Sequence, residues 1–254
     1  MVLVSVVSSV LPVSFVSAEE AAFAFSSSLP IREAAFVVGN FQTETRQVGD
    51  TTICYAFKQY NPEIMPYAAG ALERFGQWWG TYPYPILSLV DVPLEGFHGM
   101  EYGGMLLFSS ISHPNRYVVV HEVAHQWWQG LVGNNQETEA WIDEGLASYS
   151  TLLYFEEVSG ESYYSSKVHS MEKQAGKSFR TLKSPLMNFS SQEEYKKNAY
   201  TRGCLVWHEV REKIGREKLI LLLRSIQEHY KHGQITTEDI LFLIEEAAPG
   251  ALAD

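Results

Sequence analysis

The stretch His121-Glu122-Val123-Ala124-His125 decides how the rest of the chain is interpreted. Residues four apart lie on one face of an α-helix, so the two imidazoles can converge on one ion. Apolar residues flank the stretch at 117–120 and 127–128, and we therefore expect this helical turn to be well buried. Buried histidines and a buried carboxylate are costly unless something compensates them, and a metal ion does so.

A carboxylate suitable as a third ligand follows the two histidines. Glu144 lies in the opening turns of the next predicted helix, after glycines and asparagines that end the first one. Two helices joined by a short turn can pack antiparallel, which would bring Glu144 back to the histidine face. Because two histidines and a glutamate form a known zinc ligand set, we predict that His121, His125 and Glu144 hold one zinc ion. The alternative for Glu144 alone is an exposed helix carboxylate.

Three further blocks accompany HEVAHQWW at 121–128: WIDEGLA at 141–147, GMEY at 99–102 and YTRG at 200–203. Together the four blocks resemble the gluzincin metallopeptidases of the aminopeptidase N type, and they occur in the same order as in that family. A weaker sequence similarity extends from near residue 30 to near residue 250. The resemblance implies an α+β fold: a thermolysin-like catalytic domain, mostly helical with a small β-sheet. It also implies a zinc-dependent aminopeptidase that hydrolyses peptides with a free N-terminus.

The resemblance assigns roles to two residues in the reaction. Glu122 would take a proton from the attacking water as general base and pass it to the leaving amine. Tyr200 matches the tyrosine that hydrogen-bonds the oxyanion, a role suited to a phenol that is neutral at neutral pH. Tyr195, five residues earlier, is a weaker candidate for a supporting position.

The GMEY block concerns substrate binding. In the family the corresponding motif lies on an edge strand, and its glutamate binds the α-ammonium group of the substrate. Glu101 occupies that position, with Gly99 as a further substrate-binding residue. His98 and Tyr102 stand where the family usually has glycine and asparagine. This departure keeps a second interpretation open: a zinc endopeptidase with the same centre that tolerates blocked N-termini.

Length and composition bound the remaining possibilities. The chain has 254 residues and a net charge of −11, so it repels phosphate backbones and we expect no nucleic-acid partner. No segment predicts a stable membrane span. Cys54 and Cys204 could form one bridge or remain free thiols. The sequence does not reveal the oligomeric state or the preferred N-terminal residue.

Three regions are predicted along the chain: a possible signal peptide or ragged start at 1–18, a β-rich remnant of an N-terminal domain at 19–60, and a thermolysin-like peptidase domain at 61–254. A signal peptide would imply a secreted or cell-envelope protein, and its absence a cytoplasmic one. Family members usually carry about 200 β-rich residues before the catalytic domain. The short stretch here motivates a third interpretation, a catalytically inactive remnant that acts as an interaction domain.

Hydrophobic periodicity and turn residues place the expected elements. Strands are predicted at 34–39, 51–57, 86–90 and 101–109, with 42–50 as a polar connection and 82–85 as an extended segment. Helices are predicted at 62–79, 116–129, 139–157, 161–175, 194–213, 216–231 and 237–247. Thr236 and Asp239 form a capping-box pattern at the start of the last helix.

Overall fold

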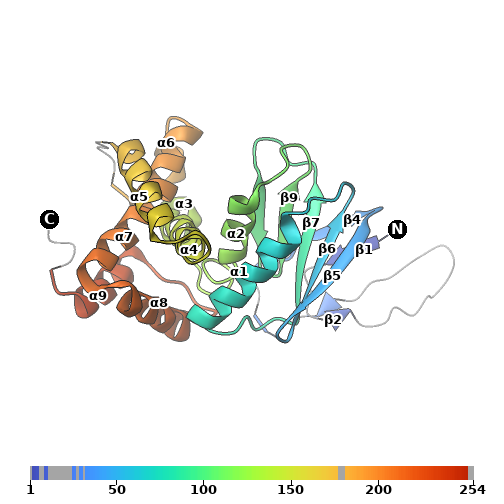
Figure 1. Ribbon diagram of the computed structural model, residues 1–254, viewed down its shortest axis with the longest axis horizontal. Coiled ribbons are helices and arrows are strands. Elements are labelled where there is room, and N and C mark those ends of the chain that lie inside the picture. The colour runs from blue at the N-terminus through green and yellow to red at the C-terminus, as the bar shows by residue number, and fades with distance from the viewer. Residues whose placement is uncertain are drawn as a thin grey trace. The chain divides into compact units, whose positions relative to one another are not determined.

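A computed structural model describes residues 29–30, 32–176 and 181–250, together with the backbone of three short strands at 2–5, 9–10 and 25–26. The chain divides into two compact units, each described here by itself. We call residues 1–73 and 82–126 the sheet unit, and residues 74–81 and 127–254 the helical unit. Figure 1 labels most of their helices and strands.

The sheet unit is built on a five-stranded sheet with the order β5-β6-β7-β9-β8. The three inner strands pair in parallel, and the edge strands β5 and β8 pair antiparallel with their neighbours. The short strand β1 (Val2–Ser5) pairs with β4 (Phe36–Gly39), and β2 (Ser9–Val10) pairs with β3 (Phe25–Ser26). The sheet strands are β5 (Gln42–Val48), β6 (Thr51–Phe57), β7 (Ile86–Val92), β8 (Gly99–Tyr102) and β9 (Met105–Ser109).

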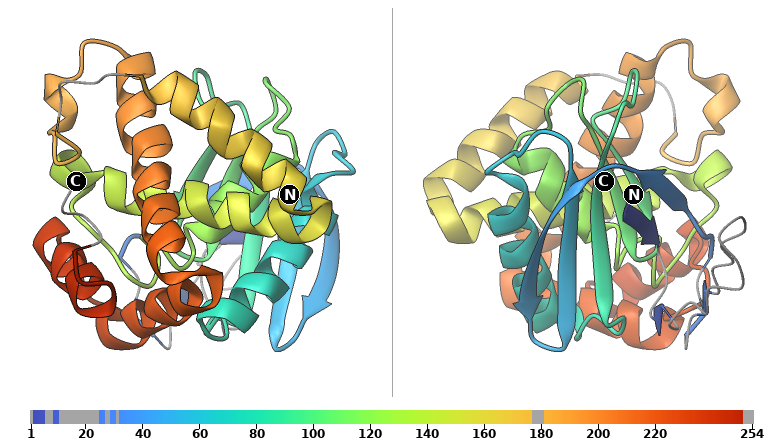
Figure 2. Two further views of the ribbon diagram at one scale, coloured as in Figure 1. Left: turned by 60° about the vertical axis from the view of Figure 1, so that its left-hand side comes forward. Right: turned by 90° about the vertical axis from the view of Figure 1, so that its right-hand side faces the viewer.

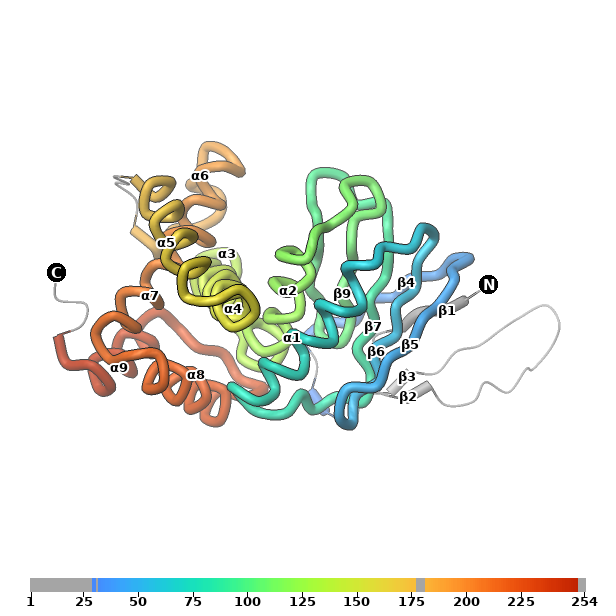
Figure 3. Tube along the Cα trace, viewed as in Figure 1, coloured from blue at the N-terminus to red at the C-terminus, as the bar shows by residue number. Residues whose placement is uncertain are grey.

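Both faces of this sheet are covered within the unit. On one face Ala56, Val90 and Met105 are fully buried, and Val37 of β4 packs against them. Helix α2 (Arg116–Ala124) contacts β8, and the tube in Figure 3 shows it running beside the sheet. The inner strands are therefore shielded from water on both sides, as parallel pairing requires.

The helical unit has a core of large aromatic side chains. Trp127, Trp128, Trp141 and Trp207 are each 2% exposed or less. The last turns of α1 (Ile64–Trp79) belong to this unit, and Figure 2 shows its helices from two further sides. The other helices are α3 (Gln136–Glu139), α4 (Trp141–Ser159), α5 (Glu161–Ala175), α6 (Gln192–Lys196), α7 (Gly203–Ile214), α8 (Arg216–Tyr230) and α9 (Thr237–Ala247), with the 3-10 turn η1 (Leu186–Asn188) and the π-helical turn η2 (Lys197–Arg202).

The predicted α+β class is confirmed: the chain is mostly helical and has a small sheet. The predicted bounds of β6, α5 and α9 match the observed ones, and the capping box is present: Thr236 Oγ1 accepts from the Asp239 N–H, and the Asp239 side chain accepts from the Thr236 N–H. The remaining predicted strands and helices are present with shifted or divided bounds.

The prediction of a polar connection at 42–50 is wrong. Residues 42–48 form β5, which pairs with β6 from Gln42 opposite Phe57 to Val48 opposite Thr51. Most of its side chains are exposed because β5 is an edge strand, so the alternation of apolar and polar residues is missing. Backbone pairing, rather than side-chain burial, forms this strand.

The predicted single strand at 101–109 is a hairpin. β8 and β9 are joined by Gly103 and Gly104, and Gly104 has a φ of +82°, which favours glycine. The prediction of an edge position for this motif agrees with the observed strand order, because β8 is the last strand of the sheet.

Two predicted helices end or change earlier than expected. The helix predicted at 116–129 ends at Ala124, because Gln126 N–H bonds to Val123 O, three residues back, and Gln129 has a φ of +110°. The helix predicted at 194–213 contains the π-helical turn η2. Helical periodicity alone does not distinguish these departures from a regular α-helix.

The structure also bears on the predictions for the cysteines, for a membrane span and for the regions along the chain. Cys54 and Cys204 are both free thiols, which resolves the alternative left open by the sequence. Among the helices of the described residues, none is long and apolar enough to cross a membrane. The predicted signal peptide at 1–18 lies mostly outside the described residues, and the predicted division between residues 60 and 61 stays a prediction.

Candidate metal centre

Helix α2 of the sheet unit carries the two predicted imidazole ligands. Its N-cap is Asn115, whose Oδ1 accepts from Tyr117 N at 2.9 Å and from Val118 N at 3.4 Å. This bond satisfies amide groups that the first helical turn leaves unpaired. Val119, Val120 and Val123 are fully buried and fix the rotation of the helix.

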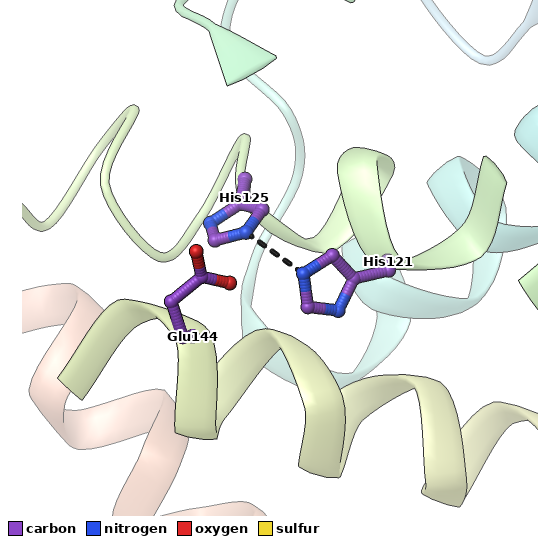
Figure 4. Close-up of side chains that lie close together, drawn as sticks. All are labelled: His121, His125 and Glu144. Carbon is purple, nitrogen blue, oxygen red and sulfur yellow. Dashed lines mark hydrogen bonds between the residues drawn. The ribbon is translucent and has the colours of Figure 1, made fainter. Parts of the chain in front are cut away.

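The two imidazoles meet as the i, i+4 spacing predicts. Nε2 of His125 lies 3.1 Å from Nε2 of His121, and the rings are 4.7 Å apart at 84° to each other. Two nitrogens bound at tetrahedral angles to one zinc, at about 2.0–2.1 Å each, would lie about 3.3 Å apart. The observed nitrogen separation fits this donor geometry. Figure 4 shows both rings with a dashed line between these nitrogens, and also labels Glu144 on α4.

Glu122 lies next to the first imidazole in sequence and is 6% exposed. Its side chain rests against Gly99, where a Cβ atom would lie only 2.3 Å from Glu122 Oε1. Side chains two residues apart in a strand share a face, so Glu101 of β8 lies on the same face as Gly99. The sheet unit thus assembles His121, His125, Glu122 and the GMEY strand.

A second carboxylate near Glu101 was not singled out from the sequence. Burial raises the pKa of Glu33, and the negative charge of Glu101 raises it further. The residue lies well before the GMEY block and carries no motif or spacing signal. The electrostatic effect of Glu101 on Glu33 places the two carboxyl groups close to each other in the sheet unit.

Glu144 of the helical unit lies in the first turn of α4 and is 7% exposed. Tyr200 donates its hydroxyl hydrogen bond to Glu144 Oε1 at 2.5 Å, and Tyr195 donates to the same oxygen at 3.4 Å. The two phenol rings are 5.8 Å apart and nearly perpendicular, at 86°. The YTRG and WIDEGLA blocks, which the family resemblance singled out, therefore come together in this unit.

Two glycines allow that approach between helices α4 and α7. A Cβ atom on Gly145 would lie 2.7 Å from the backbone carbon of Gly203, and one on Gly203 would lie 2.8 Å from Trp141 O. The backbones thus touch directly, and the π-helical turn η2 just before Gly203 carries Tyr200. Sequence reasoning missed both roles, although each glycine lies inside a quoted block.

Asp143, in the first turn of α4, accepts hydrogen bonds from the segment that precedes this helix. Its Oδ1 accepts from Asn134 Nδ2 at 2.9 Å and its Oδ2 from Gln136 Nε2 at 2.7 Å. Both donors lie in the segment between Trp128 and α4, so this carboxylate ties the connection to the helix that carries Glu144. Asp143 is 1% exposed and was not among the predicted site residues.

Comparisons with known proteins agree with these local features. The family model described as "Peptidase family M1 domain" matches residues 65–253. "Aminopeptidase M1-B" of Oryza sativa subsp. japonica is 25% identical over 207 residues, which are 74% of this chain and 24% of that protein. "Aminopeptidase 2" of Candida albicans is 25% identical over 202 residues, covering 71% of this chain and 22% of that protein. The chain thus spans about a quarter of the length of these relatives.

Solved structures show the same fold. The crystal structure of an M1 zinc metallopeptidase from Deinococcus radiodurans superposes with a TM-score of 0.80 at 20% sequence identity. The match covers 97% of this chain and 57% of that one. At this identity the likeness concerns the fold alone, and it agrees with the predicted mostly helical domain with a small sheet.

Proposed function

The chain belongs to peptidase family M1, and from that premise we propose that it is a zinc-dependent aminopeptidase of the aminopeptidase N type, which hydrolyses N-terminal residues from peptides. The observation that carries the proposal is the 3.1 Å separation of the His121 and His125 Nε2 atoms, which suits one shared metal ion. Supporting it, the relatives named above are aminopeptidases by their descriptions.

One zinc ion would be held by His121, His125 and Glu144. Two imidazoles and one carboxylate are a donor set suited to catalytic zinc. When bound, zinc would supply Lewis-acid chemistry, polarising the scissile carbonyl and lowering the pKa of a water molecule. Tyr200 and Tyr195, which donate to Glu144 Oε1, would orient that carboxylate.

The proton transfers would fall to residues of the chain itself. Glu122 would accept the proton of the attacking water and deliver it to the leaving amine. Tyr200 would release its hydrogen bond to Glu144 Oε1 and donate its single hydroxyl hydrogen to the oxygen that becomes negative in the transition state, while Tyr195 keeps its bond to Glu144. The low exposure of Glu122, at 6%, supports this role, because burial keeps bulk water away from the proton transfer.

Specificity for free N-termini would rest on Glu101. Its carboxylate lies on the edge strand β8, to which a peptide backbone can add as a further strand. A carboxylate there would pair with the α-ammonium group of the substrate through a charge-assisted hydrogen bond.

A pair of substrates tests this proposal directly. The protein, loaded with zinc, is assayed on leucine arylamide and on its N-acetylated form, with and without a chelator. We expect hydrolysis of the free form only, at least about 100-fold faster than the acetylated one, lost with the chelator and restored by zinc. Equal cleavage of both forms would instead indicate an endopeptidase. Zinc-loaded protein inert on both would favour the non-catalytic interaction domain.

A further inference from the structure

The residue after His125, Gln126, has a buried side-chain amide that contacts the β8–β9 turn. Gln126 is 1% exposed. Its Oε1 accepts from the Gly104 backbone N–H at 2.8 Å and from the Tyr82 hydroxyl at 3.0 Å. Its Nε2 donates to Tyr102 O at 3.0 Å. One side chain therefore binds the turn through both an acceptor and a donor.

These partners determine which way the amide of Gln126 points. The backbone N–H of Gly104 can only donate and Tyr102 O can only accept, so a reversed amide would place like groups against each other at both bonds. The Tyr82 hydroxyl donates to the same oxygen, and burial raises the pKa of this phenol, which keeps it protonated. A side chain that lacks either an acceptor or a donor cannot bind both backbone groups of the turn.

The β8–β9 turn depends on such contacts because its backbone does not match the twist of the strands. Tyr102 pairs with Met105, so Gly103 and Gly104 form a two-residue connection. Of these two glycines only Gly104 has a positive φ, at +82°, which is the pattern of a type II turn. Two-residue hairpins favour types I′ and II′, whereas a type II turn splays the strands. Hydrogen bonds from outside the hairpin therefore help to hold this turn in place.

The turn lies directly after the carboxylate that is predicted to bind the α-ammonium group of the substrate. Glu101 precedes Tyr102, whose carbonyl accepts the bond. Gln126, which donates it, follows His125. The amide thus joins the two backbones one residue away from each functional side chain. On the helix side the junction is fixed as well, because the Gln126 N–H bonds to Val123 O at 3.0 Å.

We propose that Gln126 is a positioning residue: its amide fixes the β8–β9 turn to the end of α2 and so sets the distance between Glu101 and the imidazoles of that helix. The proposal rests on the proposed function, which gives this distance its purpose. Because Gln126 is buried and its amide is bonded to the chain, it acts through Glu101 and not on the substrate itself. An ammonium group that is bound equally in the ground state and the transition state affects KM and leaves kcat unchanged.

Hydrogen exchange tests the contact without catalysis or metal. Exchange of the backbone amides is measured by NMR on the whole chain in the presence of a chelator. Gln126→Met keeps the length of the side chain and removes both bonds to the turn, so the Gly104 amide should exchange at least about 10-fold faster. Tyr82→Phe is the matched control, because it removes a bond to the same oxygen and leaves both bonds to the turn. In that variant the Gly104 amide should exchange at the wild-type rate.

Kinetics test the consequence for the substrate. With zinc bound, Gln126→Met should raise KM for leucine arylamide at least about 10-fold while kcat stays within about twofold. Glu101→Gln removes the anchor itself, so adding Gln126→Met to that variant should change KM by less than about twofold. Tyr82→Phe should keep the wild-type KM and kcat. A residue that only stabilises the fold would instead lower the amount of active enzyme, and hence the apparent kcat, with KM unchanged.

The outcomes separate this inference from the proposed function. Unchanged exchange at Gly104, a fall in kcat with KM unchanged, or an equal rise in KM with and without the Glu101 carboxylate would overturn the inference. If Gln126→Met does not fold, Gln126→Glu replaces it in the kinetics with the same expected rise in KM, because it loses only the donor to Tyr102 O. Failure of both variants to fold would also overturn the inference. If the wild type hydrolyses no peptide, the proposed function fails, while hydrogen exchange still decides whether Gln126 holds the turn.

Discussion

The sheet unit and the helical unit hold their functional side chains in different ways. In the sheet unit a glycine of β8 makes room for a side chain, the carboxylate of Glu122. In the helical unit Gly145 and Gly203 make room for each other's backbone, so that Tyr200 reaches Glu144. A side chain can swing away from an added methyl group, but two helix backbones cannot. The crossing of α4 and α7 is therefore less able to accommodate an added methyl group than the Gly99 position is.

The largest expected effect comes from breaking the backbone contact. Gly145→Ala would place a Cβ atom 2.7 Å from the Gly203 carbonyl carbon and force α4 and α7 apart. We expect the free energy of unfolding to fall by about 3 kcal/mol, measured by chemical denaturation.

Gly76→Ala is the control for that substitution. This glycine also lies inside a helix of the same unit, and outside that helix's own backbone the nearest atom to an added Cβ is Thr81 Cα at 4.0 Å. We expect a gain of up to about 1 kcal/mol there from helix propensity. A Gly145→Ala protein as stable as the wild type would remove the distinction drawn between the two units. Gly99→Ala should lie between these two variants.

A smaller effect concerns carboxylates of low exposure, whose partners differ between the two units. In the helical unit Glu156 is paired with Arg211 through two bonds of 2.7 and 2.8 Å. In the sheet unit Asp91 accepts from the Tyr55 hydroxyl, at 3.2 Å to Oδ1 and 3.1 Å to Oδ2. Burial raises the pKa of Asp91 to about 6, although the Tyr55 hydrogen bond and His113 act to lower it.

The sign of the resulting pH dependence follows from this raised pKa. The protonated form of Asp91 is favoured in the folded state, so its stabilising contribution is present below its unfolded pKa and is lost as pH rises through 6. Asp91→Asn cannot ionise. Its free energy of unfolding should therefore gain about 1–2 kcal/mol relative to the wild type between pH 4 and pH 7. Denaturation at several pH values checks this, and parallel curves for the two proteins would contradict it.

The predictable parts of the fold are those in which the pattern of side chains along the sequence matches the secondary structure that the backbone forms. The bounds of α5, α9 and β6 follow from periodicity and caps, and the pairing of His121 with His125 follows from helix geometry. The edge position of β8 was implied by the family resemblance and agrees with the strand order. Local rules suffice in each of these places.

The parts that were missed depend on contacts between distant segments. β5 has few buried side chains and exists because β6 offers it a backbone partner. Helices α4 and α7 cross at Gly145 and Gly203, which are far apart in the sequence. No local sequence pattern indicates that each glycine leaves space for the backbone of the other helix. The π-helical turn η2 places Tyr200 toward Glu144 and is equally invisible to helical periodicity.

The most direct measurement combines metal analysis with peptide hydrolysis in the wild type and in Glu122→Gln. We predict close to one zinc ion per chain in both proteins, with hydrolysis of leucine arylamide at least about 100-fold slower in the variant, because only the general base is lost. A Glu122→Gln protein that hydrolyses the arylamide at the wild-type rate, or a wild type that hydrolyses it after zinc has been stripped, would contradict the account.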